Sequence, residues 1–114
     1  MFMAGKQQFL EMVLDQMSDI GGVSAKAMFG GHGLYQDGVF FAIISRERLY
    51  FKADDGTRDA FEARGLARFA YTARGKVMEA SYYEAPPEVF DAPHEMQHWV
   101  RLALVAALRA RKAR

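Results

Sequence analysis

Residues 27–53, AMFGGHGLYQDGVFFAIISRERLYFKA, decide which fold this chain can form. The pair Asp37-Gly38 stands between two apolar runs, and this is a strong short-range signal of a β-hairpin. A second, fully polar turn follows at residues 45–48, SRER. Between the turns, residues 39–44 are apolar without a break, which is typical of a strand buried on both sides or of a short buried helix. The short length and the flanking turns favour the strand, so this stretch predicts three consecutive antiparallel strands.

Length and composition limit what kind of protein this is. A chain of 114 residues is the size of one domain, so we expect a single domain over residues 1–114. It contains no cysteine, which excludes disulfides and thiolate metal sites and favours a cytoplasmic location. The first residues lack the order of a signal peptide, and no apolar stretch approaches the ~20 residues of a membrane span. A net charge of +1 argues against wholesale nucleic-acid binding.

Three segments have the apolar periodicity of helices. Residues 5–17 place Phe9, Val13 and Met17 on one stripe, and residues 57–64 form a short helix capped by Asp55 or Thr57. Residues 94–110 are apolar around much of the helix circumference. Such a helix is either deeply buried or shared with a partner. We expect burial, and the alternative is a homodimer formed through this C-terminal helix.

The remaining strands complete an α+β fold. Alternating apolar residues predict strands at 23–29, 48–53, 69–72 and 77–84, and residues 88–90 resemble a single helical turn. We therefore expect a central antiparallel sheet of about five to six strands, connected as a meander. Helices from the two ends of the chain flank it, and one short helix lies between strands.

Two glycine-containing segments are candidates for binding a small anion. Gly30, Gly31, His32 and Gly33 could cradle a phosphate, but such loops normally lead into a helix, and strand-like residues follow here. The alternative, which the missing helix favours, is a bulge or kink between strands. At the turn 73–76, Arg74 and Lys76 could hold an anion with neighbouring amides, or they are solvated turn charges.

Strand tyrosines and lysines are candidates for binding nucleic acid. Aromatic side chains on a sheet can stack bases when basic residues accompany them. Tyr50 and Lys52 lie two positions apart and therefore share a face, and Lys26 could lie nearby. The alternative is that the tyrosines are half-buried strand formers. The basic end of the chain adds Arg109, Arg111 and Lys112, whose alternative role is to offset the helix dipole.

No catalytic or metal-binding set can be assembled from these residues. His94 and His98 share a helix face, but a zinc site needs a third ligand and Glu95 points elsewhere. His32 has no serine, threonine or cysteine near it in sequence to activate. We therefore expect no catalytic residue, no metal and no cofactor, and we expect that the protein is not an enzyme.

Four blocks resemble a known family. MFGGHGLYQDGVFFAII (28–44), LYFKAD (49–54), GKVMEASYYEAPPEVFDAP (75–93) and HWVRLALVAAL (98–108) are similar to the N-terminal domain of TfoX/Sxy, bacterial regulators of natural competence. The resemblance implies an α+β fold and a non-enzymatic regulatory protein with no catalytic residues. Longer members carry a helical C-terminal domain, whereas this sequence ends in RARKAR and so resembles a stand-alone single-domain member.

The functional expectation has three versions. The first is a cytoplasmic regulatory or interaction module that acts through protein contacts with a partner of unknown identity. The second is a nucleic-acid-associated transcription factor that binds weakly and in a salt-dependent way through the cations named above. The third is a small-ligand or anion-binding domain at the glycine-rich segment.

Overall fold

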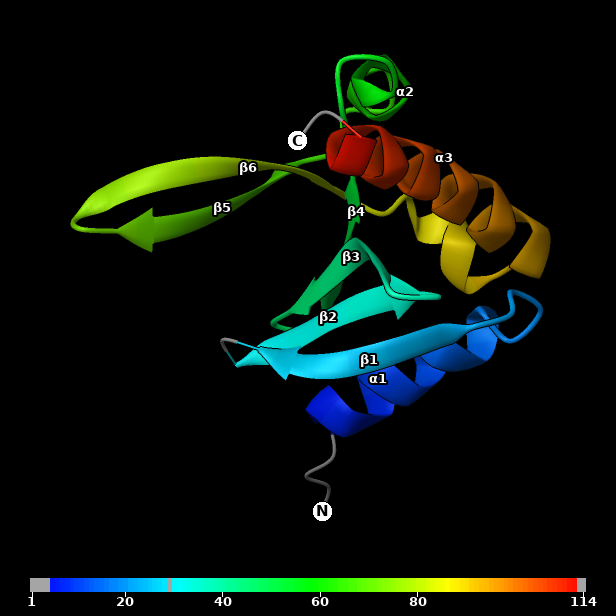
Figure 1. Ribbon diagram of the computed structural model, residues 1–114. Coiled ribbons are helices and arrows are strands. Elements are labelled where there is room, and N and C mark those ends of the chain that lie inside the picture. Colours follow the sequence, from blue (N-terminus) through cyan, green and yellow to red (C-terminus); the bar gives the residue numbers. More distant parts are fainter. Residues whose placement is uncertain (1–4, 29, 113–114) are drawn as a thin grey trace.

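The computed structural model describes residues 5–28 and 30–112, and it has the predicted α+β class (Figure 1). Most predicted elements are present with bounds within two residues. The short helix is two residues shorter at its end than predicted, and the last helix is longer. In chain order the elements are α1 (Gly5–Gln16), β1 (Val23–Met28), β2 (Gly31–Gln36), β3 (Val39–Ser45), β4 (Arg48–Lys52), α2 (Arg58–Glu62), β5 (Arg68–Ala73), β6 (Lys76–Glu84), η1 (Pro87–Phe90) and α3 (Pro93–Lys112).

The six strands form one antiparallel sheet in the order β1-β2-β3-β4-β6-β5. The first four strands are a meander, as predicted, but the prediction is wrong for the last two, because β6 rather than β5 pairs with β4. Burial explains this order. The end of β6 carries Tyr82 and Tyr83, which are buried, whereas β5 has no buried residue. The strand with more apolar surface to bury takes the inner position.

Three tight turns set the hairpins. Asp37 and Gly38 both have positive φ, 49° and 85°, which is the backbone of a type I′ turn and confirms the predicted hairpin. Arg46 and Glu47 (φ 54° and 60°), between β3 and β4, adopt the same conformation without a glycine. Their conformation carries strain, because left-handed backbone is unfavourable for residues with a Cβ.

The expected break between strands is confirmed only at Gly30, which lies in the β1–β2 turn with φ 79°. Gly31 to Gly33 are part of β2, and the irregularity in pairing comes one step later, between Leu34 and Tyr35. A Cβ on Gly31 would lie 2.0 Å from the carbonyl oxygen of Ile44. Glycine at this position therefore permits close approach of β3. The predicted first strand included Phe29, which lies outside the described residues.

The core lies between the sheet and the helices, which pack on one side of it (Figure 1). Leu10, Val13 and Met17 come from the N-terminal segment, and α3 buries a stripe that includes Met96 and Trp99. Most of the apolar circumference of α3 is thus buried, as expected, and Val105 and Leu108 stay exposed. A homodimer through this helix stays a prediction. None of the helices in residues 5–28 and 30–112 is long and apolar enough to cross a membrane.

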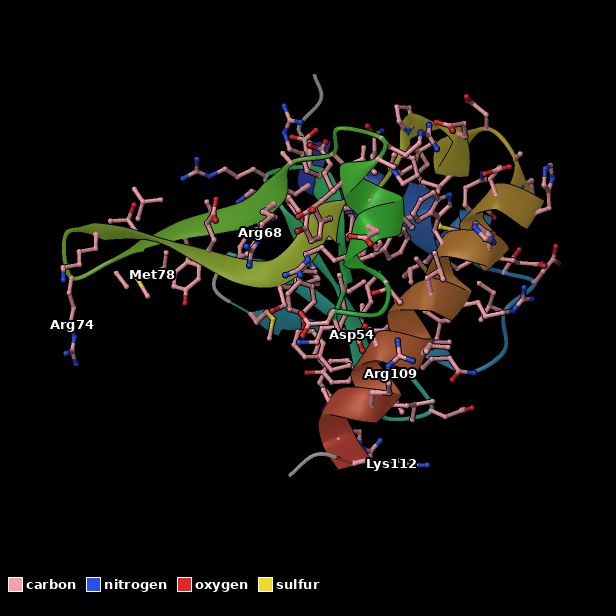
Figure 2. The ribbon with its side chains drawn as sticks, turned by 90° about the horizontal axis from the view of Figure 1, so that it is seen from above. Asp54, Arg68, Arg74, Met78, Arg109 and Lys112 are labelled. Atoms are coloured by element: carbon pink, nitrogen blue, oxygen red, sulfur yellow. The ribbon has the colours of Figure 1, made fainter. Side chains whose placement is uncertain are left out.

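Beyond the body, β5 and β6 continue as a two-stranded projection. We call residues 70–79 the ribbon. It extends well away from the helices in both views (Figures 1 and 2). Arg74 and Gly75 form its tip with positive φ, 53° and 77°. The tip is therefore a tight turn that holds the two strands in register from Ala73–Lys76 back to Ala70–Glu79.

Candidate functional site

The side of the sheet opposite the helices is a second surface, which we call the open face. Strand registers assign its residues, because side chains alternate between faces and paired residues share one. Its cations and large apolar or aromatic side chains are Lys26, Tyr35, Phe40, Ile43, Tyr50, Lys52, Phe69, Tyr71, Lys76, Met78 and Tyr82. Tyr50 and Lys52 lie on the same face, as strand alternation predicts.

A row of three aromatic rings, with a lysine at each end, crosses the inner strands of the open face. The Nζ of Lys26 lies 5.1 Å from the ring centroid of Tyr35, which stacks on Phe40 at 5.1 Å. Phe40 contacts Tyr82 at 5.9 Å, and the Nζ of Lys52 lies 5.2 Å from that ring. Burial raises the pKa of Tyr82 to about 12. These rings pack mainly against one another and hold the two lysines in place.

A second aromatic group continues the open face onto β5. Tyr50 meets Phe69 edge-on at 4.9 Å between ring centroids, and Phe69 stacks beside Tyr71 at 6.1 Å. Burial also raises the pKa of Tyr50. Tyr71 is 45% exposed, whereas Tyr82 in the first row is 9% exposed. The accessible aromatic surface therefore lies toward the ribbon.

The ribbon exposes three large side chains. Tyr71 and Met78 (43% exposed) are cross-strand partners on the open face, and Val77 (74% exposed) lies on the other face of the ribbon. Figure 2 shows Met78 on the projecting part and Arg74 at its tip. Sequence reasoning treated residues 77–84 as one ordinary strand and missed Val77 and Met78. The signal that could have found them is an apolar pair next to a turn with no helix predicted to cover it.

The cations of the described residues differ in whether a carboxylate neutralises them. Five arginines form ion pairs with carboxylates: Arg48 with Glu84 (2.8 Å), Arg58 with Asp55 (3.5 Å), Arg64 with Glu88, Arg68 with Glu79 (3.6 Å), and Arg109 with Asp54 (2.7 Å). Within the described part of the chain, Lys26, Lys52, Arg74 and Lys76 form none. The open face and the ribbon tip therefore carry positive charge that the fold does not neutralise.

The C-terminal cations lie elsewhere. Arg109 is held by Asp54, and Arg111 and Lys112 follow in the last turn of α3, with Lys112 at the end of that helix (Figure 2). Asp54 also accepts hydrogen bonds from the backbone N–H groups of Gly56 and Thr57. Thr57, one of the two predicted caps, is the N-cap residue of α2, but its side chain makes no capping hydrogen bond, and Asp54 instead holds the turn that leads into the helix. We do not include Arg109 in the open face.

The six residues predicted to bind a small anion are not brought into one site. Gly30 lies in the β1–β2 turn, and Gly31, His32 and Gly33 lie in β2, whereas Arg74 and Lys76 lie at the ribbon tip. β3 and β4 separate the two groups in the sheet order. The hollow beside the glycine segment measures about 20 Å³, enough for about one water molecule.

Other hollows and clusters are limited. A shallow hollow of about 220 Å³ has an apolar floor that includes Phe9, Leu49 and Phe90, with Arg46 and Glu47 on its rim. In the described ranges, no group of three or more histidine, aspartate or glutamate side chains is placed to hold a metal ion. Of the two histidines proposed as a pair, His94 lies 3.7 Å from Glu95 and is exposed at the start of α3.

Comparison with known proteins agrees with the fold. The profile of the TfoX N-terminal domain matches residues 15–107. A curated relative, DNA transformation protein TfoX1 of Aliivibrio fischeri, is 25% identical over 81 residues. That alignment covers 71% of this chain and 38% of the relative, so the chain matches less than half of that protein's length. The family profile spans most of the chain, including the whole sheet and α3 as far as residue 107, and on this basis the chain belongs to the TfoX N-terminal domain family.

Proposed function

We propose that this chain is a regulatory interaction module, which acts by binding a protein partner through the ribbon and does not catalyse a reaction. Membership of the TfoX N-terminal domain family supports a regulatory role. The relative named for DNA transformation makes that process the first candidate to assay. The observation that carries the proposal is the exposure of Tyr71, Val77 and Met78 on a projecting two-stranded element.

The composition of the ribbon fits a protein contact. Tyrosine, methionine and arginine are enriched at the centres of protein interfaces relative to other surfaces. Here Tyr71, Met78 and Arg74 occur within a few residues of one another, and Val77 adds apolar area on the opposite face of the ribbon. Burying a valine side chain in an interface contributes about 1.5 kcal/mol or more of hydrophobic free energy. Leaving it in water on an otherwise folded domain contributes nothing to folding.

Site-specific photocrosslinking in the source organism tests this proposal. A photoreactive benzoylphenylalanine at position 77 should give one light-dependent adduct of defined mass. The matched control is the same group at Met12, which is exposed on α1 at 41%, close to the exposure of Met78. The control position should give no such adduct.

The partner protein identified in the adduct is then purified, and its affinity for three forms of the chain is measured. It should bind the wild-type chain and the Met12→Asp variant with equal affinity and bind Met78→Asp at least tenfold more weakly. Equal binding of all three proteins would overturn the ribbon as the contact surface. So would adducts that form from position 12 as readily as from position 77.

A further inference from the structure

We propose that the open face binds a single-stranded nucleic acid, with its phosphates at Lys52, Lys76, Lys26 and Arg74 and its bases against Phe69 and Tyr71. This site overlaps the protein contact proposed above at Tyr71 and Arg74, whereas Val77, on the opposite face of the ribbon, belongs to the protein contact alone. The two proposals are tested with different ligands, a purified protein and an oligonucleotide, so each can fail without the other.

Charge complementarity is the first argument. Lys26, Lys52, Lys76 and Arg74 lie on or beside one face and have no carboxylate partner in the described residues. Other cations, such as Arg46 and Arg101, have none either, but these four gather on one face of the sheet. The acidic residue that the registers of the described strands place on this face, Glu84, is itself paired with Arg48 at 2.8 Å. Because this pair is neutral, the lysines give the open face a net positive charge, which suits a polyanion. The net charge of the whole chain does not reveal this positive face, because acidic residues elsewhere balance its charge.

The fixed position of the lysines is the second argument. Lys26 and Lys52 lie 5.1 and 5.2 Å from the ring centroids of Tyr35 and Tyr82, so their ammonium groups are held above the sheet. Lys76 follows on the ribbon, on the same face as Tyr71 and Met78. Six strands at ~4.8 Å spacing span about 24 Å, so these cations form a track across the sheet instead of a single point.

Accessible aromatic rings on that track are the third argument. Phe69 and Tyr71 stack side by side at 6.1 Å, and Tyr71 is 45% exposed. Bases stack on such rings with little sequence preference, because every base has a flat apolar face. Tyr35 and Tyr82 do not serve this role, because their rings are already covered by lysine and by Phe40.

The shape of the surface favours a single strand over a duplex. Unpaired bases can be splayed onto a sheet face, whereas a duplex keeps its bases stacked and offers grooves that accept a helix or a narrow ribbon. The open face spans six strands, and its aromatic rings lie on the sheet and not at the ribbon tip. A duplex would meet Arg74 and Lys76 but not the stacked pair.

Fluorescence anisotropy with a short labelled oligothymidylate, its oligouridylate counterpart and a duplex of equal length tests the proposal. The single strands should bind more tightly than the duplex. If four phosphates are neutralised, affinity should fall roughly fifty-fold between about 50 and about 200 mM salt. Lys52→Gln/Lys76→Gln should weaken binding and reduce this salt dependence by about half. Tyr71→Ala should weaken binding roughly tenfold with the salt dependence unchanged.

Two controls make the outcome decisive. Arg111→Gln/Lys112→Gln removes two cations from the end of α3 and should leave binding within twofold of wild type. Backbone amide shifts of the wild-type protein, titrated with the oligothymidylate, should change in β4, β5 and β6 and not in α3, which tests the site without any variant. Absence of single-strand binding at low salt, tighter binding of the duplex, or loss of binding only in the α3 variant would each overturn the proposal.

Discussion

Asp54 and Arg109 join the loop after β4 to the last turns of α3, although 55 positions separate them in the chain. The carboxylate accepts two hydrogen bonds from one guanidinium, from Nε at 2.7 Å and from Nη2 at 3.0 Å. The same carboxylate accepts the N–H groups of Gly56 and Thr57 at 3.0 and 3.1 Å. One side chain thus fixes both the start of α2 and the position of α3 over the sheet.

Substitution of Asp54 should separate these two roles. Asp54→Ala removes the ion pair and the hydrogen bonds that hold the turn before α2, and we expect it to lower the free energy of unfolding by about 1 to 2 kcal/mol. Asp54→Asn keeps an oxygen for the N–H groups of Gly56 and Thr57, so it should cost less than the alanine variant. Urea denaturation at neutral pH measures both. Equal losses in the two variants would show that the hydrogen bonds of the turn contribute nothing.

Acid should remove the stabilisation that the Asp54–Arg109 pair contributes. Hydrogen bonds from Arg109 are the largest cause that lowers the pKa of Asp54 from 3.8 to about 2. A lowered pKa in the folded state means that folding favours the ionised carboxylate. Its contribution is complete above about pH 4 and declines as pH falls toward 2. The difference in unfolding free energy between wild type and Asp54→Asn should therefore be constant from pH 7 to about pH 4 and shrink below it. A difference that grows on acidification would contradict this.

Gly31 should tolerate no side chain. A Cβ there would lie 2.0 Å from the backbone oxygen of Ile44, which cannot move without breaking the β2–β3 ladder. We expect Gly31→Ala to destabilise the fold by about 3 kcal/mol or more. Gly21→Ala is the matched control, since nothing lies within 4 Å of a Cβ at that position. Thermal unfolding of both variants checks this, and similar melting temperatures would disprove the close approach of β3.

A different pair of residues in the β3–β4 turn should raise the stability of the protein. Arg46 and Glu47 both hold left-handed backbone that costs residues with a Cβ roughly 1 kcal/mol each. Replacing them by Asn-Gly, the preferred pair for a type I′ turn, should raise the free energy of unfolding by about 1 kcal/mol. The control is Asp37→Asn in the β2–β3 turn, which already has glycine at its second position and should change little. A destabilised Asn-Gly variant would mean that side-chain contacts of Arg46 or Glu47 outweigh the backbone strain.

Local chemistry was enough to predict the hairpins but not the strand order. Asp37-Gly38 and the apolar run after it act between neighbours, so the sequence alone indicates the β2–β3 pair. Whether β5 or β6 joins β4 depends on how much surface each strand buries in the folded protein. A prediction that pairs strands in chain order cannot compare the surface that β5 buries with the surface that β6 buries. The glycines of β2 were misjudged for a related reason, since their close contact is with Ile44 on another strand.

The candidate site, too, could be predicted from local sequence only in part. Strand alternation correctly placed Tyr50 and Lys52 on one face, and it brought Lys26 to that face through the β1–β2 register. The basic C-terminus looked equally suited to bind nucleic acid, but Arg109 pairs with a residue 55 positions away that no local pattern connects to it. The exposure of Val77 was missed as well, because it depends on how far the ribbon extends past the helices, and the sequence indicates it only by an apolar pair next to a turn.

The most direct test of the central claim, that the ribbon carries the regulatory activity, is a comparison of transcript levels in the source organism. The strains compared produce equal amounts of the wild-type chain, the Val77→Asp/Met78→Asp variant or the Met12→Asp control. Because all three positions are exposed, each variant should fold. We expect the ribbon variant to lose the wild-type effect on transcripts and the α1 control to keep it. A ribbon variant that regulates as strongly as the wild type would contradict the account.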